Sequence, residues 1–382
     1  MTTAQQDELK ALAEAVRDLA GDAGGVTAAR RRFDADPTPG YDEQVWGHLG
    51  RDMGLAGLGI PEDVGGVGGG LAELTVVAEE LGRSLLPVPF FSSTVLAGQI
   101  LARAATAGGT AGAEGPDVLA GLAAGERLAA FAGTDAAGCW RADQLGSGRL
   151  GIEVTGHDGA WRLNGTADFV LDGMGADYLV VAARGADGCD LFLVPAGDPQ
   201  VQRRPLETLD PSRAVAAVGL VDAAASALTS GGTGARVVDE AVDVALVVLA
   251  AEQVGGAAAC LDMAVDYAKI RYQFSRPIGG FQAIKHKLAD LLLLVEMGRS
   301  AVDRALPAAG DARRLAEAAA VAKIWCSDAY TAVSAENVHV HGGTGFTWEH
   351  DAHLYFRRAR ADGALLGDAV VHRERLAALL GW

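Results

Sequence analysis

The sequence has few cysteines, and none lies in a pattern that binds metal or builds a disulfide framework. Cys139, Cys189, Cys260 and Cys326 are scattered through 382 residues, with no CxxC pair and no histidine at ligand spacing. Isolated thiols of this kind are typical of small buried side chains in a reducing compartment. We therefore expect a cytoplasmic protein without a metal site.

Positive charge is also scarce. Lysine and arginine number 32 against 49 acidic residues, which gives a formal net charge of −17. Nucleic acids and anionic membranes need a basic face, so neither is expected as a partner. An anionic ligand in a local basic pocket remains compatible with this composition.

Long apolar runs and a targeting signal are missing too. The N-terminus, MTTAQQDELKALAEAVRDL, mixes both charges and has no basic start or apolar stretch, so it is not read as a signal peptide. No run of about 18 apolar residues is free of charge, so we expect no membrane span. The densest run, 241–251, is interrupted by Asp243 and is better explained by a buried helix.

The glycine-rich segment GLAGLGIPEDVGGVGGG (54–70) contains no GxGxxG between a strand and a helix. A dinucleotide-binding fingerprint is therefore not expected there, and a tight connection between helices explains the glycines.

Hydrophobic periodicity divides the chain into three parts. Residues 1–125 read as helical, and 126–232 contain short alternating or apolar runs separated by Gly, Asp and Asn, typical of an antiparallel barrel or sandwich. Residues 233–382 carry four long helical patterns, at 235–275, 281–306, 310–340 and 346–380, which favour an antiparallel bundle. The predicted fold class is α+β.

The segment 251–290 reads as a helix, a sharp break and a second helix. Arg271 and Phe274 are spaced i, i+3, which would put them on one helical face, and Pro277 begins the break. Gln282 follows the break. A cation, an aromatic ring and an amide grouped in this way suit an anionic planar ligand, such as a nucleotide cofactor.

Four segments together resemble the acyl-CoA dehydrogenase family. They are GLGIPEDVGG (57–66), LNGTADFVLDGMGADYLVVAA (163–183), the segment 249–290, and VHVHGGTGF (338–346). The resemblance implies an N-terminal α-helical domain (1–125), a middle β-barrel domain (126–232) and a C-terminal four-helix bundle (233–382). The same order follows from periodicity.

The resemblance also implies FAD as cofactor. By position, Arg271 would meet the pyrophosphate, Phe274 would pack on the adenosine half and Gln282 would hydrogen-bond near them. Gly342 and Gly343 would let the backbone approach the nucleotide. Such residues often serve the FAD of a neighbouring subunit, which implies a homodimer, a homotetramer or a heterotetramer with a related subunit.

The resemblance also implies roles for two residues of the middle domain. Thr134 matches the family threonine beside the flavin ring, and Phe169 stands where many members carry a tryptophan. Simpler roles also fit the proposed FAD clamp, which is formed by Arg271, Phe274 and Gln282: Arg271 could pair with Asp266 or Glu296 on the surface. Phe274 could be a core residue, and the two glycines could form only a turn.

The family reaction desaturates an acyl-CoA or related thioester, as in fatty acid metabolism, and passes electrons to an acceptor such as an electron-transfer flavoprotein. Its base is usually a glutamate in a Glu-Gly-Thr turn shortly after an Arg-x-x-Arg run. Anchoring on Arg357 and Arg360 places Leu366, Gly367 and Asp368 at that turn. A leucine cannot accept a proton.

The second family position for the base, 26 residues before Arg271, holds Ala245. Seven residues on, Glu252 lies on the same helical face, roughly 10 Å along the axis. Glu252 is a displaced base, a group binding the far end of the acyl chain, or half of a buried pair with an Arg or Lys. Asp368 is a displaced base or the N-cap of the final helix.

Three functions follow from this pattern. The first is an acyl-CoA dehydrogenase-like oxidoreductase with a displaced base. The second is the base-less subunit of a heteromeric acyl-CoA dehydrogenase, because AEQVGG (251–256) and LLGDAVVHRERLA (365–377) resemble a bacterial branch that forms heteromers. The third is a flavin-dependent monooxygenase of the same fold, whose chemistry needs no α-proton base.

Overall fold

The computed structural model describes every residue except 1, 34–39, 108–113, 135–149 and 158, so Cys139 lies outside the described residues. The chain forms two compact units. The first comprises Met1–Phe33, Thr75–Leu86 and Leu246–Trp382, and the second Asp34–Leu74 and Pro87–Ala245. Cys189, Cys260 and Cys326 are buried free thiols, as predicted.

The helical part of the second unit is built from short elements. They are α3 (Glu43–Trp46), η1 (Gly47–Asp52), η2 (Leu55–Gly57), η3 (Glu62–Val64), η4 (Phe90–Ala97), α5 (Gly98–Thr106) and α6 (Glu114–Ala123). The glycine-rich segment is a compact connection, as predicted. A Cβ on Gly66 would lie 2.1 Å from the Ile60 carbonyl oxygen, so this approach requires glycine.

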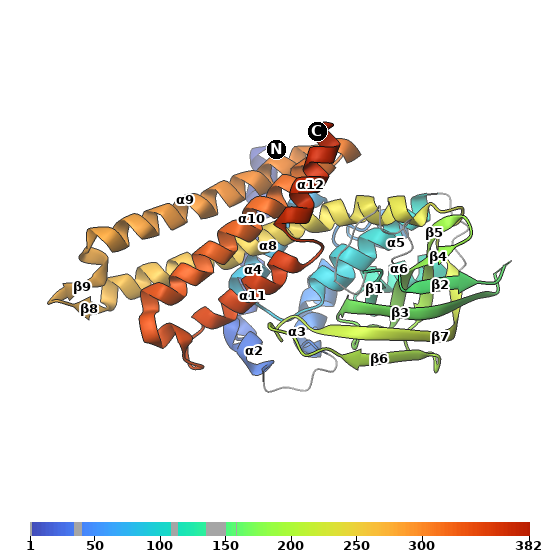
Figure 1. The fold of residues 1–382 in the computed structure, drawn as a ribbon, viewed down its shortest axis with the longest axis horizontal. Coiled ribbons are helices and arrows are strands. Elements are labelled where there is room, and N and C mark those ends of the chain that lie inside the picture. Colours follow the sequence, from blue (N-terminus) through green and yellow to red (C-terminus); the bar gives the residue numbers. More distant parts are fainter. Residues whose placement is uncertain (1, 34–39, 108–113, 135–149, 158) are drawn as a thin grey trace. The chain divides into compact units, whose positions relative to one another are not determined.

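The described strands of the second unit form a closed sheet (Figure 1). They are β1 (Ala129–Ala132), β2 (Ile152–Thr155), β3 (Trp161–Leu171), β4 (Tyr178–Gly185), β5 (Gly188–Pro195), β6 (Val201–Pro205) and β7 (Val215–Ala227). The order is β1-β4-β2-β3-β7-β5, and the additional β4–β5 pairing closes the barrel. Leu163, Leu179 and Val218 belong to the apolar interior that the closure buries.

The first unit contains the helical bundle. Its main helices are α1 (Thr3–Asp22), α2 (Val26–Arg31), the end of α4 (Leu71–Ser84), most of α8 (Gly234–Ile270), α9 (Gln282–Ala305), α10 (Ala312–His341), α11 (Ala352–Ala364) and α12 (Ala369–Leu380). Helix α10 packs against α9, α11 and α12, and α8–α11 lie side by side in Figure 1. Helical, strand and helical elements thus follow one another in the predicted order.

Helix α8 is the long apolar element noticed in the sequence. Its length and composition would allow it to cross a membrane, but 94% of its most apolar window is buried within the protein. It is therefore a buried core helix, as predicted. Two glycines explain its close fit to α4: a Cβ on Gly82 would lie 2.0 Å from the Glu252 carbonyl oxygen, and one on Gly255 would lie 1.9 Å from that of Glu79.

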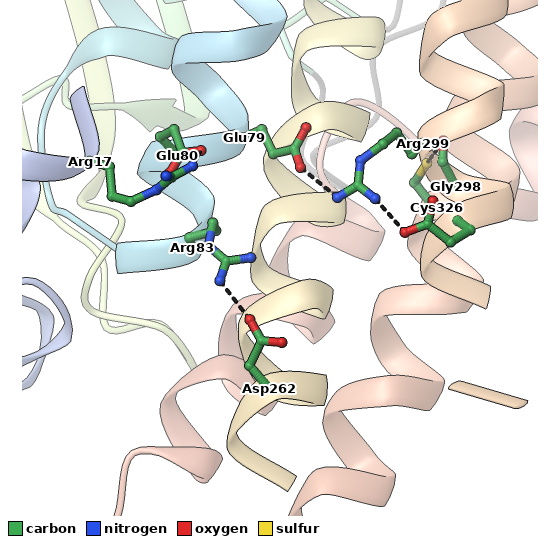
Figure 2. Close-up of polar contacts among 9 residues, drawn as sticks. Arg17, Glu79, Glu80, Arg83, Asp262, Gly298, Arg299 and Cys326 are labelled. Atoms are coloured by element: carbon green, nitrogen blue, oxygen red, sulfur yellow. Dashed lines mark hydrogen bonds and ion pairs between the residues drawn. The ribbon is translucent and has the colours of Figure 1, made fainter. Parts of the chain in front are cut away.

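Ion pairs connect α1, α4, α8 and α9 along this contact (Figure 2). Arg299 bridges two carboxylates, with nitrogen–oxygen distances of 2.8 Å to Glu79 and 2.5 Å to Glu296. The other pairs are Arg17–Glu80 and Arg83–Asp262. Most of these side chains are partly exposed, so each pair contributes little to stability.

Candidate functional site

The predicted break between two helices is present, and a β-hairpin forms it. Helix α8 stops at Ile270, and β8 (Tyr272–Gln273) pairs with β9 (Arg276–Pro277). Phe274 and Ser275 form the turn, with φ of 51° and 62°, as a tight hairpin turn requires. The expectation that Arg271 and Phe274 share a helical face is therefore wrong.

The clamp residues nevertheless lie close together at this hairpin, and all are exposed. Arg271 precedes the hairpin, the Phe274 side chain at its tip is 88% exposed, and Gln282 begins α9. Because Phe274 is exposed, it is not a core residue.

The surface pairing considered for Arg271 is absent from the described residues. Asp266 pairs with Lys269 at 2.8 Å, and Glu296 pairs with Arg299. Over the part of the chain that the structure describes, the Arg271 guanidinium forms no ion pair. Its fork of donors is therefore available to an anion.

Gly342 and Gly343 lie at the same end of the bundle as the hairpin. The rings of Tyr267 and His341 are 4.3 Å apart and bring the C-terminal ends of α8 and α10 together (Figure 1). The glycines open η7 (Gly342–Phe346), Gly342 has φ of +60°, and a Cβ on either glycine would meet no atom within 4 Å. This backbone is therefore open to close approach by a ligand.

Thr134 and Phe169 lie in the second unit, where the structure brings them together. The Thr134 hydroxyl donates a hydrogen bond of 2.5 Å to the carbonyl oxygen of Asp168. The pairing of β3 with β7 shifts register between Ala167 and Val170, and Phe169 has φ of +59° there. Such a bulge redirects a side chain, and Phe169 is 41% exposed.

Glu252 forms a buried ion pair with Arg358. The Arg358 Nη1 atom lies 2.6 Å from Glu252 Oε1, and the two side chains are 5% and 9% exposed. Arg358 comes from α11, so the pair connects two helices of the bundle. This geometry matches the structural pair that was one of the three roles left open for Glu252.

Lys323 and Asp362 extend the buried charges beside this pair, and sequence reasoning missed both. Each is 0% exposed, and the Lys323 ammonium donates to the carbonyl oxygen of Asp362 and, at 3.4 Å, to that of Gly363. The sequence did contain a sign of such a cluster: Arg358 and Asp362 are spaced i, i+4 just before the predicted base turn, which is the spacing of an ion pair on a helix. Lys323 therefore holds the end of α11, where that turn begins.

Leu366 occupies a strained and well-supported turn. Its side chain is 1% exposed and its φ is +57°, a conformation rarely adopted by non-glycine residues. Gly367 follows with φ of +97°. The His372 imidazole lies 2.9 Å from the Leu366 carbonyl oxygen through Nε2, and burial together with nearby Lys323 lowers the pKa of His372 to about 4. A neutral His372 therefore supports the turn.

Asp368 caps helix α12. Its Oδ1 atom accepts hydrogen bonds of 2.9 Å from the Val370 amide and 3.0 Å from the Val371 amide, which is an N-cap arrangement. Ala245, the other family position for a base, is 0% exposed within α8. Both positions at which the resemblance would place the base therefore carry side chains that cannot take a proton.

Comparisons with known proteins agree with this architecture. The acyl-CoA dehydrogenase C-terminal domain matches residues 232–381, and the N-terminal domain matches 6–110. The acyl-CoA dehydrogenase IpdE2 of Mycobacterium tuberculosis is 34% identical over 363 residues, covering 94% of this chain and 93% of the relative. The chain therefore belongs to the acyl-CoA dehydrogenase family, a family of flavoprotein oxidoreductases acting on CH–CH groups.

Two solved structures extend the similarity. A variant of a steroid ACAD, Tcur3481-Tcur3483, superposes with a TM-score of 0.85 at 32% identity and covers 98% of both chains. The ChsE4-ChsE5 complex from Mycobacterium tuberculosis matches with a TM-score of 0.83 at 28% identity, covering 100% of this chain and 98% of that one. The predictions of family and fold are confirmed, whereas the individual site residues remain predictions.

Proposed function

We propose that this chain is the base-less subunit of a heteromeric acyl-CoA dehydrogenase. In this role it binds FAD and helps a related subunit to desaturate an acyl-CoA thioester. The observation that carries the proposal is Leu366, buried in the turn where the family usually places its glutamate.

The two nearby carboxylates already have structural roles. Glu252 is engaged by Arg358 in a buried pair, and abstracting a proton would neutralise it and weaken its attraction to the buried guanidinium. Asp368 is engaged by two backbone amides at the start of α12. Catalysis by Glu252 or Asp368 in a self-sufficient enzyme is the alternative, and flavin bleaching by the isolated chain would support it.

The described residues fit FAD in their chemistry. Arg271 offers an unpaired planar cation for the pyrophosphate, Phe274 an exposed ring for the adenosine half, and Gly342 and Gly343 an open backbone. Thr134 and Phe169 would face the flavin ring. When bound, FAD supplies the hydride acceptor of the reaction.

Exposed aromatic side chains at the hairpin end of the bundle support a partner subunit. Phe274, Phe346 and Trp348 are 88%, 74% and 61% exposed, and a group of exposed apolar rings at one end of a bundle is a feature of protein-binding surfaces. Two similar structures are of paired proteins, Tcur3481-Tcur3483 and ChsE4-ChsE5. We propose a related acyl-CoA dehydrogenase subunit as the partner and an electron-transfer flavoprotein as the electron acceptor.

The test is anaerobic flavin bleaching with a panel of acyl-CoA thioesters, including steroid-derived ones because one similar structure is a steroid ACAD. The chain alone should fail to bleach, and the complex with a co-encoded family member should bleach. Bleaching by the isolated chain would contradict the base-less assignment. Oxygen-dependent turnover with a reductase, without bleaching by any pair, would favour a flavin monooxygenase.

Restoring the carboxylate gives a complementary prediction. Leu366→Glu places a base in the turn supported by Lys323 and His372, so the isolated variant should bleach its flavin with a thioester that the complex accepts. Leu366→Gln, which has nearly the same shape and no base, is the matched control. Equal bleaching by the two variants would show that the new activity does not come from a carboxylate.

A further inference from the structure

A cavity of about 440 Å³ lies at one end of the bundle, between α9, α10 and α12. None of its lining residues has a part in the proposed flavin chemistry. The residues that matter for its chemistry are Arg304, Arg314, Glu317, Val321, Leu376 and Leu380. The volume lies within the range of about 300–1,000 Å³ typical of small-molecule sites.

Two arginines give the cavity its charge. Arg304 comes from the last turn of α9, and Arg314 from the first turn of α10. Within the described ranges, neither guanidinium forms an ion pair or a side-chain hydrogen bond. This is notable in a chain with 49 acidic and 32 basic residues, where carboxylates outnumber cations.

The acidic residue of the lining does not neutralise these arginines. Glu317 already receives a hydrogen bond of 3.2 Å from Arg313, whose other nitrogen donates to the Leu379 carbonyl oxygen. The two unpaired guanidinium groups therefore leave a local excess of positive charge. Their planar forks match the oxygens of an anion.

The remaining walls are apolar. Val321 projects from α10, and Leu376 and Leu380 come from the last two turns of α12. A small inorganic anion would leave these walls in contact with water. A ligand with an apolar body would cover them and gain from the burial.

We propose that this cavity binds an amphipathic carboxylate. Arg304 and Arg314 hold the carboxylate, and Val321, Leu376 and Leu380 contact an apolar body the size of a medium-length alkyl chain. The site is separate from the proposed FAD clamp, and its occupancy does not depend on whether the chain carries a catalytic base.

The test is isothermal titration of the purified holoprotein with sodium decanoate. Arg304→Gln and Arg314→Gln should each weaken binding about tenfold, the loss expected for one charge-assisted contact. Arg373→Gln is the matched control, because Arg373 lies on α12 but pairs with Asp328 away from the lining. Its affinity for decanoate should equal that of the wild type.

Two further probes separate the head of the ligand from its body. Decanol lacks the charge and inorganic phosphate lacks the apolar body, so both should bind much more weakly than decanoate. The proposal is overturned if wild-type protein does not bind decanoate up to millimolar concentration, or if either probe binds as tightly. It is also overturned if both cavity variants bind decanoate like the wild type, because the bound site would then be elsewhere.

Discussion

Removing one member of the Glu252–Arg358 pair should destabilise the protein far more than removing both. The two side chains are 9% and 5% exposed and lie 2.6 Å apart, so each single substitution removes a close opposite charge from a charge that stays inside the bundle. Such losses cost about 3–5 kcal/mol, whereas exchange of both partners for apolar residues is often nearly neutral. We therefore expect Glu252→Leu and Arg358→Met each to reduce the free energy of unfolding by about 3–5 kcal/mol.

The double variant, Glu252→Leu with Arg358→Met, should be more stable than either single variant. Urea unfolding of the four proteins gives midpoints and slopes, and the cycle isolates the coupling between the two side chains. Asp328→Leu is the control: it breaks an exposed pair with Arg373, in which the side chains are 61% and 54% exposed. That loss should be about 0–1 kcal/mol.

These variants test the structural role of Glu252, and Glu252→Gln tests a catalytic one. If the single variants unfold like the wild type, the pair does not stabilise the bundle and the structural argument fails. Glu252→Gln retains the size of the side chain and removes the base. If that variant keeps native stability but loses bleaching in the assembled complex, Glu252 takes the proton and the base-less assignment is wrong.

Three further predictions test individual residues. Arg271→Ala should lower the FAD occupancy of the purified protein, measured by the flavin-to-protein absorbance ratio. The control Arg373→Ala should keep full occupancy, and equal occupancy of the two variants would refute the pyrophosphate assignment. Asp368→Ala should cost about 1 kcal/mol of stability, and Asp368→Ser, which can still cap α12, should restore it without changing bleaching by the complex. Loss of bleaching in both Asp368 variants would instead identify a base. His372 has its pKa lowered to about 4 from 6.5, mainly by burial, so only the unfolded chain gains a proton between these values. The free energy of unfolding should therefore fall by about 3 kcal/mol as the pH drops through that window. His372→Gln should remove this pH-dependent loss, which is measured by unfolding at pH 7 and about pH 4.

Features encoded locally were predictable from the sequence. The helical periods at 281–306 and 310–340 correspond to α9 and α10, and the short runs of 126–232 contain the barrel strands. Hydrophobic periodicity depends only on residues close together in the chain, so it can be recognised without knowledge of the fold. Local patterns could not decide between a barrel and a sandwich, because closure depends on the pairing of β4 with β5.

The features that were missed depend on contacts across the chain or on a rare backbone conformation. Arg271 and Phe274 have helical spacing, but two residues with positive φ at the turn make a hairpin that the spacing does not reveal. The partner of Glu252 is 106 residues away in sequence. Burial of a carboxylate predicts that a cation must be near, but the identity of Arg358 follows only from the packing of α8 against α11.

If Leu366 replaces a catalytic glutamate, the turn indicates that only the side chain has changed and that the backbone of the site is kept. A non-glycine residue with positive φ persists only where its surroundings hold it in place, at a cost of about 1–3 kcal/mol. Here Lys323 holds the preceding carbonyl groups, and His372 contacts the carbonyl oxygen of Leu366 itself. These supports act on the backbone, so they would position a glutamate as well as they position a leucine. Under the proposed base-less role, the difference from an active subunit is confined to one side chain, which is the pattern expected when a related subunit supplies the base.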